Sequence, residues 1–281
     1  MITSHAPETA SGDESSRLRD TRDAFDSVSA DYDGDRGNNE LIQEMRAEMW
    51  RWLDATFRSP SRLVDLGCGT GLDAVRMAQV GHRVTATDWS ARMVERTADR
   101  AAREQVAERV STLAIGAHEL AKLPGDGDYD GAYSDLGPLN CVPDLGCVAA
   151  ECARLLRPGG SLVFTVIGRV CPWEIAHYLR RGNVARARVR FARGTVPVNM
   201  NKRTIWTRYY GPREFYRAFR REFELEHFRG LCVSVPPPYL TGLHDRHPRW
   251  HARLWSVDRR IAGWPVLRGI GDHFLIVMKK R

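Results

Sequence analysis

Short apolar runs alternate with helical patterns from residue 62 onward, and this alternation limits the possible folds more than any other feature of the sequence. The strand-like runs occupy residues 62–66, 82–87, 110–115, 129–134 and 161–166, and the helical patterns occupy residues 72–79, 90–105 and 147–156. Strands and helices that alternate at these lengths form βαβ units, so that helices cover both faces of a mostly parallel sheet. The pattern predicts an α/β fold of the doubly wound type.

The alternation is interrupted twice after the fifth strand. A helix that begins at Gly211-Pro212 and strands over residues 223–234 and 274–278 resume it, which leaves residues 169–210 and about 237–271 as insertions. Long loops without secondary structure are uncommon in compact domains, so we expect both insertions to form helices that act as lids. The predicted division of the chain is a disordered polar tail (1–16), a cap of two helices (17–60), the core (61–168), a basic lid (169–210), and the end of the core with the second lid (211–281).

Composition excludes several classes of protein. With 43% hydrophobic and 27% charged residues the chain is typical of globular domains. No apolar stretch approaches the roughly 18 residues that a membrane span needs, and the polar first 30 residues do not resemble a secretion signal. The six cysteines lack metal-ligand spacing, so we interpret them as reduced thiols of a cytoplasmic protein. The sequence sets no oligomeric state.

The positive charge is concentrated in one segment. Residues 169–221 hold 14 Lys and Arg against 2 Asp and Glu, whereas the net charge of the whole chain is only +7. Such a segment is typical of contact with nucleic acid, with an anionic surface, or with an anionic or carrier-linked substrate. The alternative is a solvated helix face whose arginine stems cover apolar surface.

A glycine-rich loop joins the first strand to the first helix of the core. In the stretch VDLGCGTG, Gly67, Gly69 and Gly71 alternate with other residues, a G-x-G-x-G spacing that departs from the G-x-G-x-x-G of dinucleotide-binding loops. The next strand ends at Asp88, 23 residues after Asp65, where a carboxylate can accept hydrogen bonds from both hydroxyls of a ribose. A helix N-cap is the alternative role for Asp88, because a helical pattern follows it.

Four motifs in order resemble the class I S-adenosylmethionine-dependent methyltransferases: VDLGCGTG, the acidic strand end at Asp88, YDGAYSDLGPLN and LLRPGG. The resemblance covers roughly residues 20–168 and implies a Rossmann-like sheet of seven strands, the last of them antiparallel, with S-adenosylmethionine as cofactor. It implies that the cofactor-binding residues line the methionine end, the ribose, the adenine and the transfer point. In that order they are Tyr32, Asp65, Gly67, Cys68 and Gly69, then Asp88, then Trp89 and Met93, and finally Asp135 and Leu136.

The sequence departs from the family pattern after the third strand. Many relatives place an acidic residue there, against the adenine amino group, whereas this chain has Gly116-Ala117-His118. Backbone groups near Ala117 or the imidazole of His118 are the substitutes that the sequence offers, so both residues are included among the predicted cofactor contacts.

Ligands of open α/β sheets bind beyond the carboxyl ends of the strands, and both insertions adjoin that edge. We expect the two lids to enclose a small-molecule acceptor, with five tryptophans nearby: Trp173, Trp206, Trp250, Trp255 and Trp264. The candidate catalytic residues are His273, which follows Asp272, together with Tyr209 and His177. Adjacent strand residues point to opposite faces, which argues against direct contact between Asp272 and His273.

The three histidines at 244, 247 and 251 have spacings that suit a metal, but no cysteine or carboxylate cluster accompanies them, so no metal site is predicted. The sequence therefore favours a methyltransferase that acts at oxygen, nitrogen or carbon of a small molecule, in secondary metabolism. The alternatives are an RNA methyltransferase that uses the basic segment, which we expect less because no RNA-binding module is present, and a cyclase-type enzyme that keeps the cofactor without transferring methyl.

Overall fold

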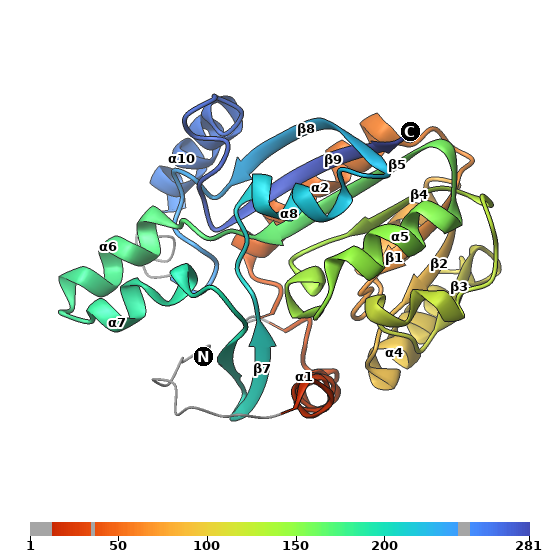
Figure 1. Ribbon diagram of the computed structural model, residues 1–281, viewed down its shortest axis with the longest axis horizontal. Coiled ribbons are helices and arrows are strands. Elements are labelled where there is room, and N and C mark those ends of the chain that lie inside the picture. Colours follow the sequence, from red (N-terminus) through yellow and green to blue (C-terminus); the bar gives the residue numbers. More distant parts are fainter. Residues whose placement is uncertain (1–12, 35–36, 241–247) are drawn as a thin grey trace.

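A twisted sheet of seven strands forms the centre of the molecule in a computed structural model, which describes residues 13–34, 37–240 and 248–281 (Figure 1). The order of the strands is β3-β2-β1-β4-β5-β9-β8. Their bounds are β1 Arg62–Leu66, β2 Arg83–Thr87, β3 Val110–Leu113, β4 Tyr129–Ser134, β5 Leu156–Ile167, β8 Phe223–Leu231 and β9 His273–Lys280.

The direction of the strands confirms the predicted fold class. Strands β1 to β5 pair in parallel, whereas β9 lies between β5 and β8 and runs antiparallel to both. The predicted strand over residues 223–234 ends earlier, at Leu231, because Cys232 has a φ of 55° and turns the chain away from the sheet.

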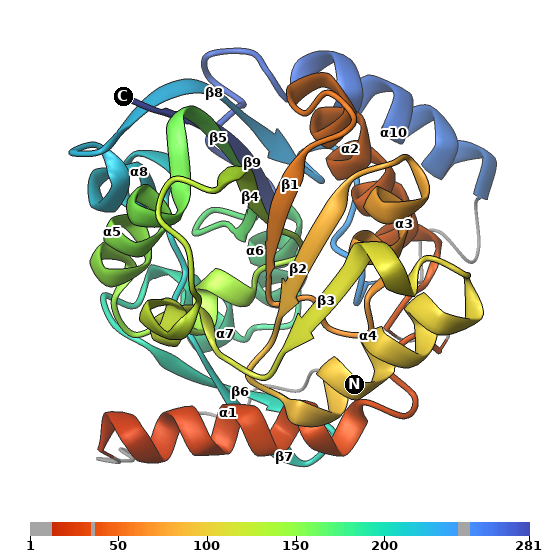
Figure 2. The same ribbon diagram turned by 90° about the vertical axis from the view of Figure 1, so that its right-hand side faces the viewer.

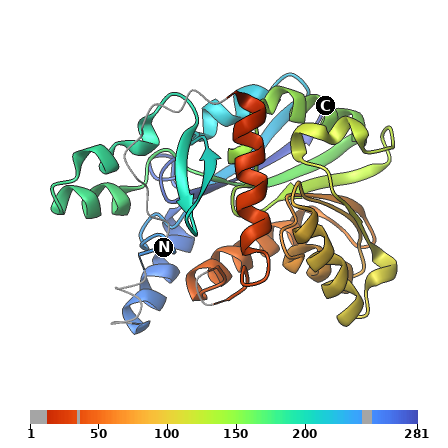
Figure 3. The same ribbon diagram turned by 90° about the horizontal axis from the view of Figure 1, so that it is seen from below.

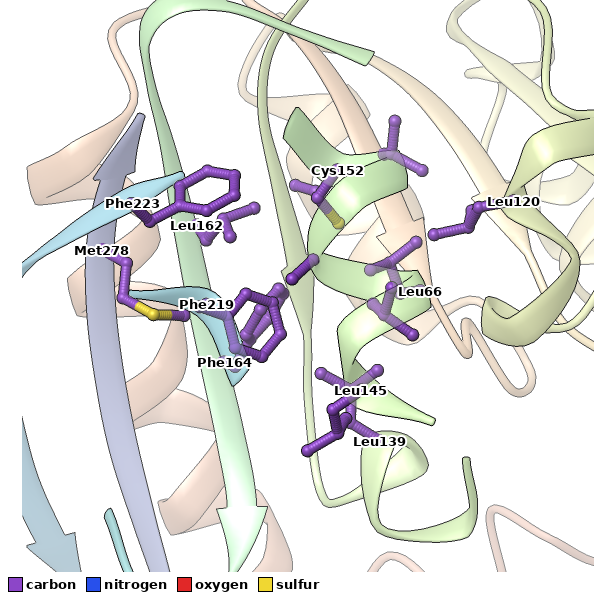
Figure 4. Close-up of a cluster of buried hydrophobic side chains, with 14 of the residues drawn as sticks. Leu66, Leu120, Leu139, Leu145, Cys152, Leu162, Phe164, Phe219, Phe223 and Met278 are labelled. Atoms are coloured by element: carbon purple, nitrogen blue, oxygen red, sulfur yellow. The ribbon is translucent and has the colours of Figure 1, made fainter. Parts of the chain in front are cut away.

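Helices cover both faces of the sheet because the strands alternate apolar side chains between two cores. On one face lie α2 (Glu40–Thr56), α3 (Leu72–Gln79) and α4 (Ala91–Arg103), and their contacts include Met49 and Leu53 against Leu63. The other face carries α5 (Leu145–Leu155) and α8 (Pro212–Phe219), which bury the phenylalanine cluster of Figure 4. Because helices cover both faces of the sheet, a site can form only at its edge, beyond the carboxyl ends of the parallel strands.

The N-terminal cap consists of two helices, as the periodicity predicts. The first, α1 (Glu14–Val28), lies across the end of the molecule beside a hairpin of β6 (Val196–Met200) and β7 (Arg203–Thr207) (Figure 2). Helix α1 begins at Glu14, so residues 14–16 belong to a helix and not to the predicted polar tail, whose first 12 residues lie outside the described ranges.

The basic lid contains both helices and a hairpin. Helices α6 (Pro172–Arg180) and α7 (Val184–Ala187) project from the sheet as an arm, and a short 3-10 turn, η4 (Val189–Phe191), leads back (Figure 3). Hairpin β6–β7 was not predicted, because the apolar residues of its strands form only short alternations. Its Trp206 donates from Nε1 to Asp20 of α1 at 3.0 Å, so the hairpin holds α1 in place.

The second insertion contributes α10 (Pro248–Ile261), which packs against α2 through Trp255. The prediction that the tryptophans surround a pocket is largely wrong. Trp255 is 3% exposed within an apolar cluster and Trp206 packs against α1, whereas Trp250 and Trp264 are 62% and 59% exposed. Stacking of inserted elements and exposure to solvent therefore account for four of the five indole rings.

No helix in the described part of the chain combines the length and the apolar character that crossing a membrane requires. Within the same residues, no group of three or more histidine, cysteine, aspartate or glutamate side chains is arranged to hold a metal ion. His244 and His247 lie outside the described residues, so the histidine spacing noted in the sequence is not tested. All six cysteines are free thiols.

Candidate functional site

The carboxyl ends of β1, β2, β4 and β5 meet at one edge of the sheet, and most of the candidate residues follow these strands. Gly67 follows β1, Asp88 follows β2 and Asp135 follows β4. Parallel pairing of β1 with β2 and with β4 brings the three strand ends side by side. The site is therefore built where open α/β sheets bind ligands.

The glycine loop is fastened to the neighbouring strand by its own backbone. The N–H groups of Gly67 and Cys68 both donate to the carbonyl of Thr87, at 2.8 and 2.9 Å. Gly67 has a φ of 84°, and a Cβ there would lie 2.3 Å from Cβ of Pro138. Only glycine combines this left-handed backbone with so close an approach, so the loop passes tightly beneath the residues that follow β4.

Asp88 bridges the glycine loop and the next helix. Its Oδ2 accepts from the N–H of Gly69 at 3.0 Å, and its Oδ1 accepts from the N–H of Ser90 at 2.9 Å. The N-cap of α4 is Ser90, whose hydroxyl accepts from the N–H of Met93, so the N-cap alternative for Asp88 is wrong. Burial raises the pKa of Asp88 to about 6, against the opposing effect of these N–H donors.

The N-terminal cap lies over the glycine loop, and Tyr32 is the residue that approaches it. A Cβ on Gly69 would lie 3.9 Å from the ring of Tyr32. Next to it, Asp33 accepts from the hydroxyl of Thr70 at 2.7 Å and pairs with Arg100 of α4. Burial raises the pKa of Tyr32 to about 12, so its hydroxyl stays protonated at neutral pH and is available as a donor.

The candidate adenine contacts form a second group beyond Asp88. The rings of Trp89 and His118 lie against each other, with centroids 3.9 Å apart and planes at 44°. Met93, on the buried face of α4, is 1% exposed, and Ala117 is half-buried. Burial lowers the pKa of His118, so its imidazole is neutral at pH 7 and has one acceptor and one donor nitrogen.

Asp135 belongs to a buried charge network that the sequence did not reveal. Its Oδ1 accepts from the hydroxyl of Thr165 at 2.7 Å and from the N–H of Leu136 at 3.0 Å. Among the described residues Oδ2 has no hydrogen-bond partner, and Nη1 of Arg46 lies 3.6 Å from it. Arg46 also pairs with Asp73, and burial together with Asp73 raises the pKa of Asp135 to about 7.

Asp65 lies deeper in the same acidic region. It is 2% exposed, and burial raises its pKa well above the ordinary range, with the charge of Asp73 adding to the effect. The network also includes Trp50, whose Nε1 donates to Asp73 at 2.7 Å. Arg46, Trp50 and Asp73 lie on amphipathic helices where the sequence pattern predicts packing only, so no local signal marked them.

Two of the three candidate catalytic residues lie at this edge. His273 is 8% exposed, and its Nδ1 lies 2.9 Å from Oδ2 of Asp272, so the two side chains are in contact, contrary to expectation. The strand begins at His273 itself and Gly271 has a φ of 133°, so Asp272 does not follow strand alternation. His177 instead contacts Arg181, which directly follows its helix α6, and it does not join the other two candidates at the edge of the sheet.

Tyr209, the third candidate, lies beside the same charges. It is 8% exposed, and the guanidinium of Arg190 lies 5.1 Å from the centre of its ring. Burial raises the pKa of Tyr209 to about 12, which makes its hydroxyl a hydrogen-bond donor and a poor base.

Comparison with known proteins agrees with this geometry. Residues 63–160 match the sequence model of a methyltransferase domain. The chain is 41% identical over 106 residues to 27-O-demethylrifamycin SV methyltransferase of Amycolatopsis mediterranei, a match that spans 37% of this chain and 38% of that protein. The chain thus aligns with well under half the length of this relative.

Two solved structures share the whole architecture at low identity. The cyclase SpnF superposes with a TM-score of 0.61 at 17% identity, covering 92% of this chain and 96% of that one. A 1,6-didemethyltoxoflavin-N1-methyltransferase of Burkholderia thailandensis, solved with its substrate and S-adenosylhomocysteine, gives a TM-score of 0.58 at 19% identity, with 99% and 93% covered. At identities of 17% and 19%, these two similarities show that the fold is shared and do not show a shared activity.

The residues at the edge fit the cofactor of this fold. The free buried oxygen of Asp135 suits the ammonium of the methionine part, and the Asp88 carboxylate suits ribose hydroxyls. Residues 63–160 therefore match a methyltransferase domain, and they lie in a sheet whose strand order is β3-β2-β1-β4-β5-β9-β8.

Proposed function

We propose that this protein transfers the methyl group of S-adenosylmethionine to a small-molecule acceptor at oxygen, nitrogen or carbon. The observation that carries the proposal is the Asp88 carboxylate, half-buried at the end of β2 and aligned by the N–H groups of Gly69 and Ser90. Bound there, the cofactor supplies an electrophilic methyl on a sulfonium. The chain's own contribution is to hold it, to orient the acceptor and to exclude water.

The residues assigned to the cofactor divide by position. The loop Gly67–Gly69 and Asp65 hold the methionine part below Tyr32, Asp88 holds the ribose, and Trp89, Met93, Ala117 and His118 hold the adenine. The rings of Trp89 and His118 touch in this structure, so we expect them to separate or to present one shared face when the adenine binds. Asp135 and Leu136 adjoin the transfer point, and Leu136 packs near Trp255 of the second insertion.

An anionic or carrier-linked acceptor is the finer part of the proposal. The arm formed by α6 and α7 exposes Arg180, Arg181 and Arg188, and Arg193 follows it in the same basic segment. Arginine guanidinium groups match carboxylate and phosphate oxygens in pairs. Tailoring of a secondary metabolite is supported by the rifamycin-modifying relative, and a cytoplasmic location is supported by the free thiols.

The decisive experiment is isothermal titration of the protein with S-adenosylmethionine and with S-adenosylhomocysteine. The wild type should bind both, and Asp88→Ala should weaken binding by about 100-fold, because two charge-assisted hydrogen bonds are lost. Asp99→Ala is the matched control, since Asp99 is an exposed acid on the following helix. Absence of binding to the wild type would remove the proposed function.

A product measurement separates methylation from the other activities of this fold. The protein is incubated with S-adenosylmethionine and a set of phenols, amines, carboxylic acids and phosphate esters, and the masses of the products are measured by mass spectrometry. Methyl transfer adds one CH₂ to the acceptor, whereas cyclisation adds no mass. Arg188→Glu with Arg193→Glu should raise KM for anionic acceptors and leave neutral ones unchanged, and equal effects on both classes would refute the anionic acceptor.

A further inference from the structure

One arginine of the basic segment is buried. Arg190 of η4 is 5% exposed, and its guanidinium donates to Glu174 of α6 from two nitrogens, at 3.1 and 2.8 Å. The same group donates to Oδ1 of Asp272 at 2.6 Å and to the carbonyls of Gly168 and Asp272, both at 3.0 Å. Tyr239, from the chain just before α10, donates to Glu174 and accepts from Arg190. The two insertions therefore meet at the ion pair of Arg190 with Glu174.

The other oxygen of Asp272 faces the candidate base. Its Oδ2 lies 2.9 Å from Nδ1 of His273, and the Arg190 guanidinium occupies Oδ1. An ionised carboxylate can only accept, so it selects the imidazole tautomer that carries its proton on Nδ1 and leaves Nε2 without one. His273 pairs with Ile167 at the carboxyl end of β5, which places it at the same edge of the sheet as Asp135.

We propose that Arg190 is a positioning residue, which keeps Asp272 as a carboxylate aimed at Nδ1 and so presents the unprotonated Nε2 of His273 to the acceptor. The proposal rests on the proposed methyl transfer. The acceptor gives its proton to Nε2 as its oxygen or nitrogen bonds to the methyl carbon, and the electron pair of the broken carbon–sulfur bond stays on sulfur. His273 is then the catalytic residue, and Arg190 acts only through Asp272.

The charge balance explains why an arginine is needed. Burial alone would raise the pKa of Asp272, but Arg190 and His273 hold it well below the usual range. Without the cation, Asp272 would take up a proton, keep it and donate a hydrogen bond to Nδ1, so the imidazole would carry its own proton on Nε2. Nε2 of His273 could then no longer accept a proton, although the side chains of Asp272 and His273 remained in place.

Imidazole nitrogen NMR on protein labelled with ¹⁵N-histidine tests this directly and needs no acceptor. His273→Gln identifies the signals of His273. The wild type should show the Nδ1–H tautomer, and a wild-type His273 in the Nε2–H form would overturn the proposal even if every Arg190 variant failed to fold.

Two substitutions then separate positioning from simple packing. Arg190→Met should shift His273 from mostly Nδ1–H to mostly Nε2–H, whereas Arg190→Lys keeps a cation and should retain Nδ1–H. Arg213→Met, which removes an exposed arginine of α8, is the control and should leave the tautomer unchanged. An unchanged tautomer in folded Arg190→Met would refute the role. S-adenosylhomocysteine binding, measured on the same samples, reports the proposed function separately.

Discussion

The edge of the sheet that carries the candidate site has two parts, a cofactor half around Gly67 and Asp88 and an acceptor half around Asp272 and His273. The two halves are held together in different ways. Around the cofactor, the contacts run between backbone groups of neighbouring motifs, as when Gly67 and Cys68 donate to Thr87. Around the acceptor, buried charged side chains from distant parts of the chain meet, as when Arg190 pairs with Asp272. A half built from backbone leaves a sequence motif, whereas a half built from long-range ion pairs leaves none, because any arginine and any aspartate look alike in a sequence.

The largest expected effect removes the cation of the acceptor half. Arg190→Met should lower the free energy of unfolding by about 3–5 kcal/mol, because Glu174 and Asp272 would remain buried without their partner. Urea denaturation measures it, and Arg188→Met, which removes an exposed arginine, should stay within about 0.5 kcal/mol. A loss under about 1 kcal/mol for Arg190→Met would show that the two halves do not differ in this way.

The cofactor half should instead be sensitive to a single methyl group. Gly67→Ala places a Cβ at a φ of 84° and 2.3 Å from Cβ of Pro138, which should cost about 2–4 kcal/mol of stability. Gly194→Ala is the control, because no atom lies within 4 Å of its added Cβ. Thermal unfolding followed by circular dichroism compares the two, and equal melting temperatures would mean that the glycine loop tolerates a side chain.

The fold could be predicted from the sequence because the sheet is made of local patterns. β1, α3 and β4 begin and end at the predicted residues, and the antiparallel last strand was expected from the family resemblance. Hairpin β6–β7 was missed because its strands pack against α1 at the far end of the chain, through Thr21 and Asp20, and a contact between distant segments leaves no local pattern.

The candidate site was predictable to the extent that strand ends supply it. Asp88 and Asp135 follow strands whose parallel pairing was foreseen, so their proximity was expected. Arg46 was not singled out and Arg190 was counted only as part of the basic segment, because their roles depend on which carboxylates they meet after folding. The contact between Asp272 and His273 was judged improbable by strand alternation, and the backbone turn at Gly271 is what permits it.

A change of pH should distinguish the halves by a smaller margin. Burial raises the pKa of Asp88 to about 6, and the ribose requires the carboxylate form. The affinity for S-adenosylhomocysteine should therefore be full well above pH 6 and fall as the pH drops through it, by about tenfold at pH 5. Titration calorimetry from pH 5 to 8 measures this, and Asp88→Asn should lose the step near pH 6 and keep only the dependence that Asp135 adds with its pKa of about 7. A flat profile for the wild type would place the ribose elsewhere.

The smallest effect on stability and on ligand affinity is expected for a solvent-exposed tryptophan, Trp264. Trp264 is 59% exposed and its backbone, not its ring, makes the hydrogen bonds to residues 261, 267 and 268. Trp264→Ala should therefore change stability by under about 0.5 kcal/mol and leave S-adenosylhomocysteine affinity unchanged. Fluorescence and calorimetry on the same protein check both. A loss of affinity would mean that this tryptophan folds over the cofactor after all, and that the acceptor half closes through apolar contacts in addition to the ion pairs around Arg190.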